Sequence, residues 1–213
     1  MRMRVSKGIV AKKNIEDAAA KLFSTQGFNR VTMREIAKEA GCSHTLIYMY
    51  YKDKEDLLRQ MACPLLERLE SILEELAHDP VISPTERLRL ASKEVISFCL
   101  FQRSTTMILF QGAPTIRVTD EPEECDRLRS RIFTRLREAV ISCLPAKKMD
   151  SAQTLYRIYL FMLHGMIMNF LDPPGDPAEQ LHRASRLIDR CVDILLGDSE
   201  SWLPSPMEKP LLF

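Results

Sequence analysis

The chain has 213 residues, of which 46% are apolar, so it can bury the cores of one small and one medium domain without metal or disulfide staples. Its 30 Lys and Arg nearly balance its 29 Asp and Glu, and its seven glycines leave little room for loops that cradle phosphate groups. The sequence contains no H-E-x-x-H motif, no nucleophile elbow and no readable motif with paired carboxylates beside a histidine, which argues against an enzyme built on the body of the chain.

Charge is distributed unevenly along the chain. Residues 1–60 carry twelve Lys and Arg against seven Asp and Glu, whereas the rest of the chain carries 18 against 22. A basic head on a mildly acidic body predicts that the amino-terminal part binds nucleic acid. The first thirteen residues contain five basic residues and no acid, which fits either an arm lying along phosphates or a solvated terminus.

The cysteines and histidines predict neither a disulfide framework nor a metal site. No C-x-x-C pair and no secretory leader are present, so we expect six reduced packing cysteines in a cytoplasmic protein: Cys42, Cys63, Cys99, Cys125, Cys143 and Cys191. The four histidines lack metal-ligand spacing, so we expect no metal and no other cofactor.

Residues 32–50 predict two short helices around a glycine-containing turn. Thr32 and Glu35 form a T-x-x-E capping box for the first helix, and Gly41 permits the backbone reversal. Ser43 is placed to cap a second helix that runs through Tyr50. This is the layout of a DNA-reading helix-turn-helix.

The outer face of the second helix contains no acidic residue, which suits a surface that meets phosphate. In this motif the amino-terminal side chains of the second helix contact base edges, so we expect base contacts from His44, Thr45, Leu46 and, one turn later, Met49. Tyr48 and Tyr50 have hydroxyls that reach the flanking backbone, and Lys54 opens the next helix, where an anion is favoured.

Several of these residues also fit ordinary structural roles. His44 fits a solvated surface histidine, and Leu46 fits packing between helices as well as contact with a thymine methyl. Tyr48 and Tyr50 fit interface aromatics, whereas Cys42 fits a turn filler better than a redox switch.

The segment Ile15 to Leu57 resembles the DNA-binding domain of the TetR family of bacterial transcriptional regulators. The resemblance rests on AA..LF...GF, on VTMREIAKEAG and on the Y-x-Y-[YF]-x-x-K-E-x-L pattern that begins at Tyr48, and it covers about a fifth of the chain. It implies an inward-packed Tyr51 and phosphate contacts from Thr32, Tyr48, Tyr50 and Lys54. We expect a phosphate contact from Ser43 as well. This chain departs from many relatives at Thr45 and Leu46, and His44 replaces a common basic residue, so its base preference cannot be borrowed.

The body reads as helices throughout. Asp53 begins a helix toward Ala77 in which Pro64 introduces a bend or a break. Caps and helical periodicity predict further helices over 84–102, 104–111, 122–144, 151–171 and 177–196, with a loop over 115–120.

The last two helices suggest assembly. Residues 151–171 are apolar on nearly every side but are interrupted by Arg157, His164 and Asn169, so they are too short an apolar run to cross a membrane. Residues 177–196 carry one apolar stripe, and together the two helices fit half of a four-helix homodimer interface, as the resemblance also implies. The alternative is two core helices of a monomer.

The resemblance further implies that a small molecule held in the body changes the separation of two DNA-reading heads. Aromatic and methionine side chains suited to a hydrophobic or aromatic effector are Phe98, Phe101, Met107, Phe110, Phe133, Tyr159, Met162 and Met166. The same residues also fit a plain core.

The sequence therefore predicts an all-α fold of about nine helices. A three-helix helix-turn-helix domain spans residues 1–57, a helical effector-binding and dimerisation domain spans 58–197, and a proline-rich tail spans 198–213. We expect a homodimeric regulator, with no membrane association, that binds an operator in double-stranded DNA and acts as a repressor released by ligand. The alternative is a DNA-tethered regulator whose body binds a protein partner.

Overall fold

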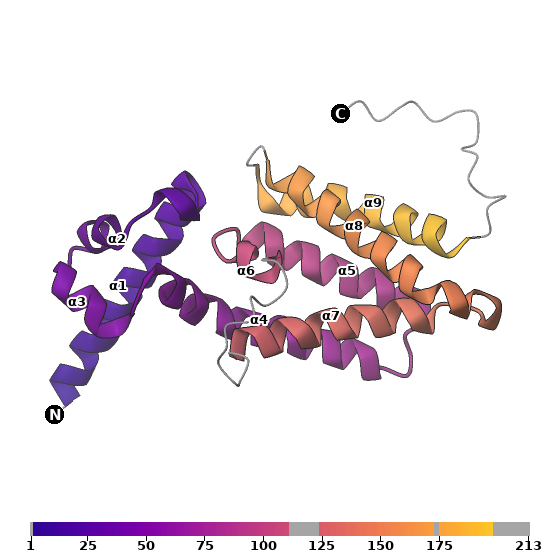
Figure 1. Ribbon diagram of the computed structural model, residues 1–213, viewed down its shortest axis with the longest axis horizontal. Helices are drawn as coiled ribbons and strands as arrows, with labels where there is room; N and C mark the ends of the chain where they lie inside the picture. Colours follow the sequence, from indigo (N-terminus) through magenta and orange to yellow (C-terminus); the bar gives the residue numbers. More distant parts are fainter. Residues whose placement is uncertain (1, 111–123, 173–174, 198–213) are drawn as a thin grey trace. The chain divides into compact units, whose positions relative to one another are not determined.

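The computed structural model describes residues 2–110, 124–172 and 175–197, and within them the side chains of all but residues 2–7 and Met107. Every regular element in this part of the chain is helical, as predicted. The elements are α1 (Arg2–Gln26), η1 (Phe28–Arg30), α2 (Met33–Glu39), α3 (His44–Tyr50), α4 (Lys54–His78), α5 (Pro84–Phe101), α6 (Thr106–Phe110), α7 (Glu124–Ser142), η2 (Ala146–Ser151), α8 (Ala152–Leu171) and α9 (Pro177–Leu196) (Figure 1).

The chain divides into two compact units. The first, which we call the reading unit, comprises Met1–Ser71 and Phe101–Ile132, and the second, the body unit, comprises Ile72–Leu100 and Phe133–Phe213. The predicted domain boundary at residue 57 falls inside the reading unit, within α4.

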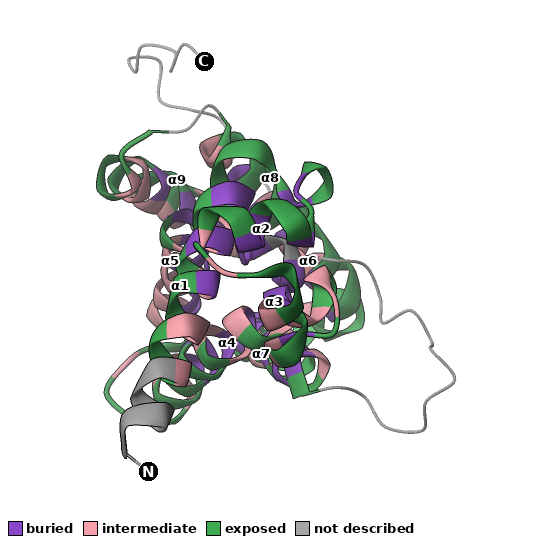
Figure 2. Ribbon diagram, turned by 90° about the vertical axis from the view of Figure 1, so that its left-hand side faces the viewer, coloured by how far each residue is buried: buried purple, intermediate pink, exposed green. Residues whose placement is uncertain are grey.

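The core of the reading unit forms where apolar side chains of its first helices converge. Ile15 of α1, Ile36 of α2, Ile47 of α3 and Leu57 of α4 are each completely buried. Figure 2 shows α2 and α3 with buried residues on one side and exposed residues on the other. This pattern fixes which face of α3 points outward.

Local sequence signals set most helix ends. Pro84 and Glu86 follow Ser83, whose hydroxyl accepts from the Glu86 backbone N–H at 3.3 Å, so α5 begins where the cap predicts. Asp176 caps α9 by accepting from the backbone N–H of Glu179 at 2.9 Å.

The middle helices agree less closely with their predicted spans. The helix expected over 104–111 is the short α6, and α4 continues through Pro64 to His78. The loop expected over 115–120, the start of the helix expected at residue 122 and the tail from 198 lie outside the described residues.

The body unit packs its helices around fully buried aromatic and aliphatic side chains. Leu88 and Ile96 of α5, Tyr159 and Ile167 of α8 and Ile188 of α9 have no exposed surface. Helices α8 and α9 lie side by side (Figure 1). An ion pair between Lys93 and Asp189 at 2.7 Å, and another between Arg89 and Asp193, join α5 to α9.

Two of the six cysteines contradict the expectation that all are reduced. Cys63 of α4 and Cys125 of α7 form a disulfide across 62 positions of sequence. No spacing signal in the sequence marks this pair, because the pairing depends on how α4 and α7 pack. Cys42, Cys99, Cys143 and Cys191 form no disulfide.

Candidate nucleic-acid interface

Helix α2 begins at a complete capping box. The Thr32 hydroxyl accepts from the Glu35 backbone N–H at 3.3 Å, and the Glu35 carboxylate accepts from the Thr32 backbone N–H at 2.8 Å and from its hydroxyl at 2.7 Å. These hydrogen bonds lower the pKa of Glu35. Thr32 is exposed, so a phosphate could reach it. Its hydroxyl already makes two hydrogen bonds within the capping box, and the predicted phosphate contact would have to share this hydroxyl.

The turn between α2 and α3 depends on a glycine. Gly41 has a φ of 66°, in the left-handed region that other residues rarely adopt. The backbone N–H of Cys42 then donates to the Ala37 carbonyl at 2.9 Å. Burial raises the pKa of the Cys42 thiol and so favours its protonated form, which fits a turn filler.

Helix α3 exposes most of the side chains predicted to read bases. Ser43 caps it by accepting from the Leu46 backbone N–H at 3.1 Å, and the buried Ile47 fixes its inner face. His44 and Thr45 are exposed, and Met49 is 76% exposed, whereas Leu46 is half-buried. The intermediate burial of Leu46 is compatible with either role, so its contact with a base stays a prediction.

Two aromatic rings on the outer face of α3 lie against each other. The rings of His44 and Tyr48 are 4.9 Å apart in an edge-to-face arrangement. Tyr48 is 47% exposed, and α3 contains no acidic residue. The arrangement presents an imidazole and a phenol hydroxyl together on a surface that does not repel phosphate.

The tyrosines at the end of α3 divide into an inner and an outer residue. Tyr51 is 1% exposed and its hydroxyl donates to Glu16 of α1 at 2.8 Å, so the predicted inward position is confirmed. Burial, and then the Glu16 carboxylate, raise the pKa of Tyr51. Tyr50 is half-buried, and its hydroxyl lies close to Gly8 of α1.

Lys54 has a role that the sequence did not reveal. Its ammonium group donates to the carbonyl oxygens of Phe28 at 2.8 Å and Val31 at 2.9 Å, and it lies 4.3 Å from the centre of the Phe28 ring. It therefore fastens the start of α4 to the turn that precedes α2. The family motif also predicts that Lys54 binds phosphate. The ammonium group has three N–H donors, so it can bind the two carbonyls and still donate to a phosphate.

The residues predicted to line an effector pocket fall into both units. Phe98, Phe133, Tyr159, Met162 and Met166 belong to the body unit, and Phe101 and Phe110 belong to the reading unit. Tyr159 is completely buried, donates to or accepts from the Ser92 hydroxyl at 2.8 Å, and has its pKa raised by burial. Phe101 is 53% exposed, and the side chain of Met107 lies outside the described part.

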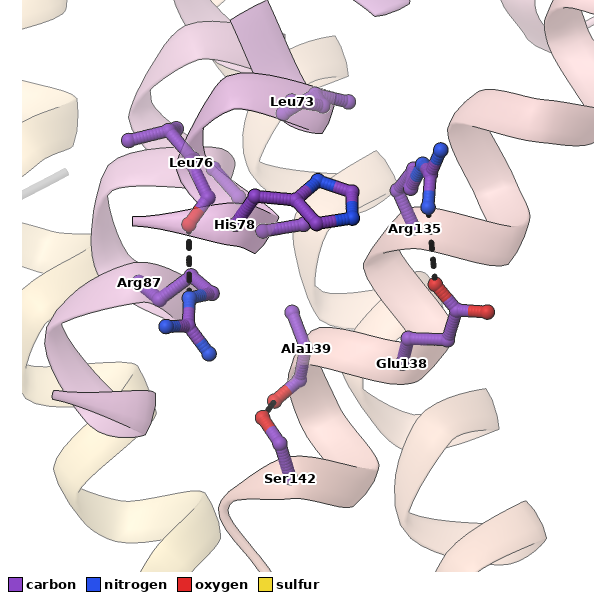
Figure 3. Close-up of a pocket in the computed structure, with 10 residues that line it drawn as sticks. Leu73, Leu76, His78, Arg87, Arg135, Glu138, Ala139 and Ser142 are labelled. Atoms are coloured by element: carbon purple, nitrogen blue, oxygen red, sulfur yellow. Dashed lines mark hydrogen bonds and ion pairs between the residues drawn. The ribbon is translucent and has the colours of Figure 1, made fainter. Parts of the chain in front are cut away.

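A cavity of about 210 Å³ opens in the body unit among other residues (Figure 3). None of the seven predicted effector residues whose side chains the structure describes lines it. Its walls are Leu73, Leu76, Ala77, His78, Arg87, Ala91, Arg135, Glu138, Ala139 and Ser142.

Both arginines of this cavity have internal partners. Arg87 donates to the carbonyl oxygens of Leu76 at 2.8 Å and Asp79 at 2.9 Å, which ties α5 to the end of α4. Arg135 pairs with Glu74 at 3.0 Å and with Glu138 at 3.6 Å. The cavity walls are thus more polar than the predicted effector set, and no sequence motif marks them.

Two absences hold for the residues that the structure describes. No cluster of His, Cys, Asp or Glu there could hold a metal ion. Among the same residues, no helix combines the length and the apolar character that a membrane span requires.

A family model for bacterial regulatory proteins of the tetR family matches residues 15–61. The HTH-type transcriptional regulator HbdR of Aromatoleum sp. (strain CIB) is 34% identical over 110 residues, which are 50% of this chain and 46% of HbdR. The chain thus spans about half the length of this curated relative. The residues that the family model matches include α2, α3 and the start of α4.

Solved structures of low sequence identity share the fold over most of the chain. A TetR-family transcriptional regulator from Bordetella parapertussis has a TM-score of 0.65 at 19% identity and covers 91% of this chain and 98% of its own. The regulator PfmR from Thermus thermophilus has a TM-score of 0.61 at 22% identity, covering 85% of this chain and 96% of its own. The relatives and the shared fold are those of transcriptional regulators and not of enzymes.

Proposed function

Because the chain belongs to the TetR family of bacterial regulatory proteins, we propose that it is a cytoplasmic homodimer that binds an operator in double-stranded DNA. We further propose that it acts as a repressor and leaves the operator when a small hydrophobic or aromatic ligand binds the body unit.

The outer face of α3 carries the proposal. Its inner side is fixed by the buried Ile47, and the opposite side exposes His44, Thr45 and Met49 without an acidic neighbour in the helix. A helix of this kind enters the major groove with its first residues at base edges. We assign base contacts to His44, Thr45, Met49 and the outward part of Leu46.

Phosphate contacts are proposed for side chains that flank this face. Tyr48 and Tyr50 carry hydroxyls at the end of α3, and Thr32 and Ser43 stand just before α2 and α3. Lys54 completes the set. Two of the three N–H donors of its ammonium group bind backbone carbonyls, and the third is assigned to phosphate. Contacts of this kind set affinity and register without selecting sequence.

The homodimer is proposed to form through α8 and α9. Helix α8 exposes Ile158, Phe161 and Met168 along one stripe, with Phe161 73% exposed, and α9 exposes Leu187 and Ile194. Gly165 lies in the same stripe, and apart from its chain neighbours and the backbone of its own helix, no described atom lies within 4 Å of where a Cβ would stand. Exposed apolar side chains at this spacing suit helix packing between two copies of the chain.

The effector is proposed to be hydrophobic because the eight predicted residues are aromatic or methionine. Phe98, Tyr159 and Met166 are buried in the body unit, so a ligand that reaches them must displace packing side chains. A body unit that stays packed instead favours the second candidate, a regulator that recruits a protein partner. The partly polar cavity lined by Arg87 and Arg135 is a second place where a ligand could bind, and the compound screen covers it as well.

Selection of duplexes from a random pool by the purified protein tests the proposal. We expect recovery of one sequence class whose binding weakens steeply with salt, as phosphate neutralisation requires. Compounds are then screened for release of the recovered duplex. Recovery of random sequences at every salt concentration would contradict the proposed operator binding.

A further inference from the structure

We propose that Cys63 and Cys125 are a reversible redox pair, a modification site through which hydroperoxides weaken operator binding. The inference rests on the proposed DNA binding, and it adds an oxidant-sensing input that is distinct from the hydrophobic effector.

The two cysteines are placed to bond without rearrangement of the backbone. Their Cα atoms are 5.2 Å apart, which lies within the range that disulfides span. Cys63 is in the third turn of α4, and Cys125 is in the first turn of α7. Both helices contribute these turns to the reading unit.

A small oxidant can reach the pair from solvent. A cavity of about 310 Å³ in the reading unit is lined by Asp56, Arg59, Gln60, Cys63, Pro64, Glu124 and Cys125. Cys63 is half-buried, whereas Cys125 is 4% exposed, so Cys63 is the thiol that meets the oxidant first. The Cys125 sulfur lies behind it, 3.4 Å from the Arg59 carbonyl oxygen, to which a reduced thiol would donate.

The core around the pair does not depend on the bond. Ala62 and Leu66 of α4 and Leu128 of α7 have no exposed surface. Each helix therefore buries apolar side chains close to the pair in sequence, and this burial does not require a bond between the sulfur atoms. In a cytoplasmic regulator, such a bond is more consistent with sensing than with a permanent staple.

The position of the pair couples it to the recognition helix. Leu57 and Leu58 are buried, and the Lys54 ammonium group donates to the carbonyl oxygens of Phe28 and Val31. These contacts attach the first turn of α4 to the segment between α1 and α2. Pro64 has no backbone N–H, which removes one helical hydrogen bond directly after Cys63. The disulfide links α4 to α7 next to Pro64, where the helix lacks this hydrogen bond. It therefore limits the bending of α4 that allows α3 to fit into the major groove of DNA.

The chemistry balances with a hydroperoxide as oxidant. The Cys63 thiolate attacks the distal oxygen of the peroxide, giving a sulfenic acid and releasing an alcohol or, from hydrogen peroxide, water. The Cys125 thiolate then attacks the Cys63 sulfur, forming the disulfide and expelling hydroxide that is protonated to water. Two thiols are oxidised by two electrons, and a dithiol reductant reverses the reaction by exchange.

The test uses the full chain and the duplex that the reduced protein selects from a random pool. Hydrogen peroxide is expected to link the Cys63 and Cys125 peptides and to raise the Kd for that duplex about tenfold, as when only about a tenth of the protein is competent to bind. A dithiol should restore the Kd. Cys63→Ser and Cys125→Ser should bind the duplex and ignore peroxide, whereas Cys42→Ser, the matched control with the pair intact, should respond like the wild type.

Three results would overturn the redox proposal while leaving DNA binding intact. They are an unchanged or lowered Kd after oxidation, a peroxide response that persists in Cys63→Ser, and a disulfide that a dithiol fails to reduce in the folded protein. Failure of the reduced protein to select any duplex would instead refute the proposed function. Should either serine variant fail to fold, thiol alkylation of the reduced wild type at the pair gives the same peroxide-insensitive comparison.

Discussion

The ammonium group of Lys54 donates to the carbonyl oxygen of Phe28 at 2.8 Å. This contact joins the first residue of α4 to the 3-10 turn between α1 and α2. The same ammonium group donates to the Val31 carbonyl oxygen. One side chain therefore links the start of α4, the 3-10 turn and the residue that follows this turn. Lys54, which the family motif predicts to bind phosphate, thus also stabilises the reading unit through internal hydrogen bonds.

Replacement of Lys54 should therefore affect both stability and DNA binding. Lys54→Ala is expected to lower the free energy of unfolding by about 1 to 2 kcal/mol, because two backbone carbonyls lose a charged donor. It should also reduce the slope of log affinity against log salt by about 1. Lys54→Gln keeps a donor without the charge, so it should recover part of the stability but not the slope. Urea unfolding and salt titrations measure the two effects, and an unchanged unfolding energy in Lys54→Ala would refute the tether.

The base-reading assignment predicts changes in sequence preference. His44→Ala or Thr45→Ala should alter which duplexes are selected, because each removes a side chain at the leading edge of α3, with a cost of about 1 to 3 kcal/mol for the preferred sequence. Ser24→Ala, which removes an exposed hydroxyl from α1, is the control and should leave the selected sequence unchanged. Identical selected sequences for all three variants would show that α3 does not read bases.

The buried hydroxyl of Tyr51 predicts a pH-dependent loss of stability. Removal of its hydrogen bond to Glu16 in Tyr51→Phe should cost about 1.5 kcal/mol at neutral pH. The raised pKa keeps Tyr51 neutral in the folded chain while the unfolded chain ionises above about pH 10. The free energy of unfolding should therefore fall as pH rises above that value, and the fall should be shallower in Tyr51→Phe.

Chemical unfolding at a series of pH values measures this effect. Tyr159 also has a raised pKa, so part of the alkaline decline should remain in the variant. Tyr48→Phe removes an exposed hydroxyl from α3 and is the matched control. An alkaline decline of equal slope in Tyr51→Phe and in the wild type would contradict the assignment.

The exposed stripe on α8 predicts a charge-sensitive dimer. Phe161→Glu should raise the dimer dissociation constant at least about tenfold, because it would bury a carboxylate at the centre of an apolar interface. Val81→Glu places the same charge on a side chain that is 90% exposed between α4 and α5, and it should leave the dimer intact. Sedimentation velocity distinguishes the species, and dimers of equal strength in both variants would place the interface elsewhere.

Short-range signals made most of the fold predictable. The capping box at Thr32, the cap at Ser43 and the cap at Asp176 each begin a helix where the sequence places it. These signals depend on side chains within one turn of the helix end, so one sequence is enough to find them. The inward position of Tyr51 came from the family pattern, and its contact with Glu16 could not be foreseen because the two residues are 35 positions apart.

Contacts between distant segments account for what the sequence missed. The disulfide joins residues 62 positions apart, and Lys54 reaches back to Phe28 across 26. Arg87 of α5 and Arg135 of α7 both line the cavity of the body unit, again through packing. The predicted aromatic effector set was chosen by residue type alone, which does not separate a ligand wall from an ordinary core.

Footprinting of the selected duplex tests the central claim most directly. A dimer that reads DNA through α3 should protect two half-sites related by a twofold axis, with centres separated by about one helical turn or a whole multiple of it. Phe161→Glu should lose this paired pattern at protein concentrations where the wild type keeps it. A single protected site that tolerates His44→Ala and Thr45→Ala without change, or no protection at all, would contradict the account.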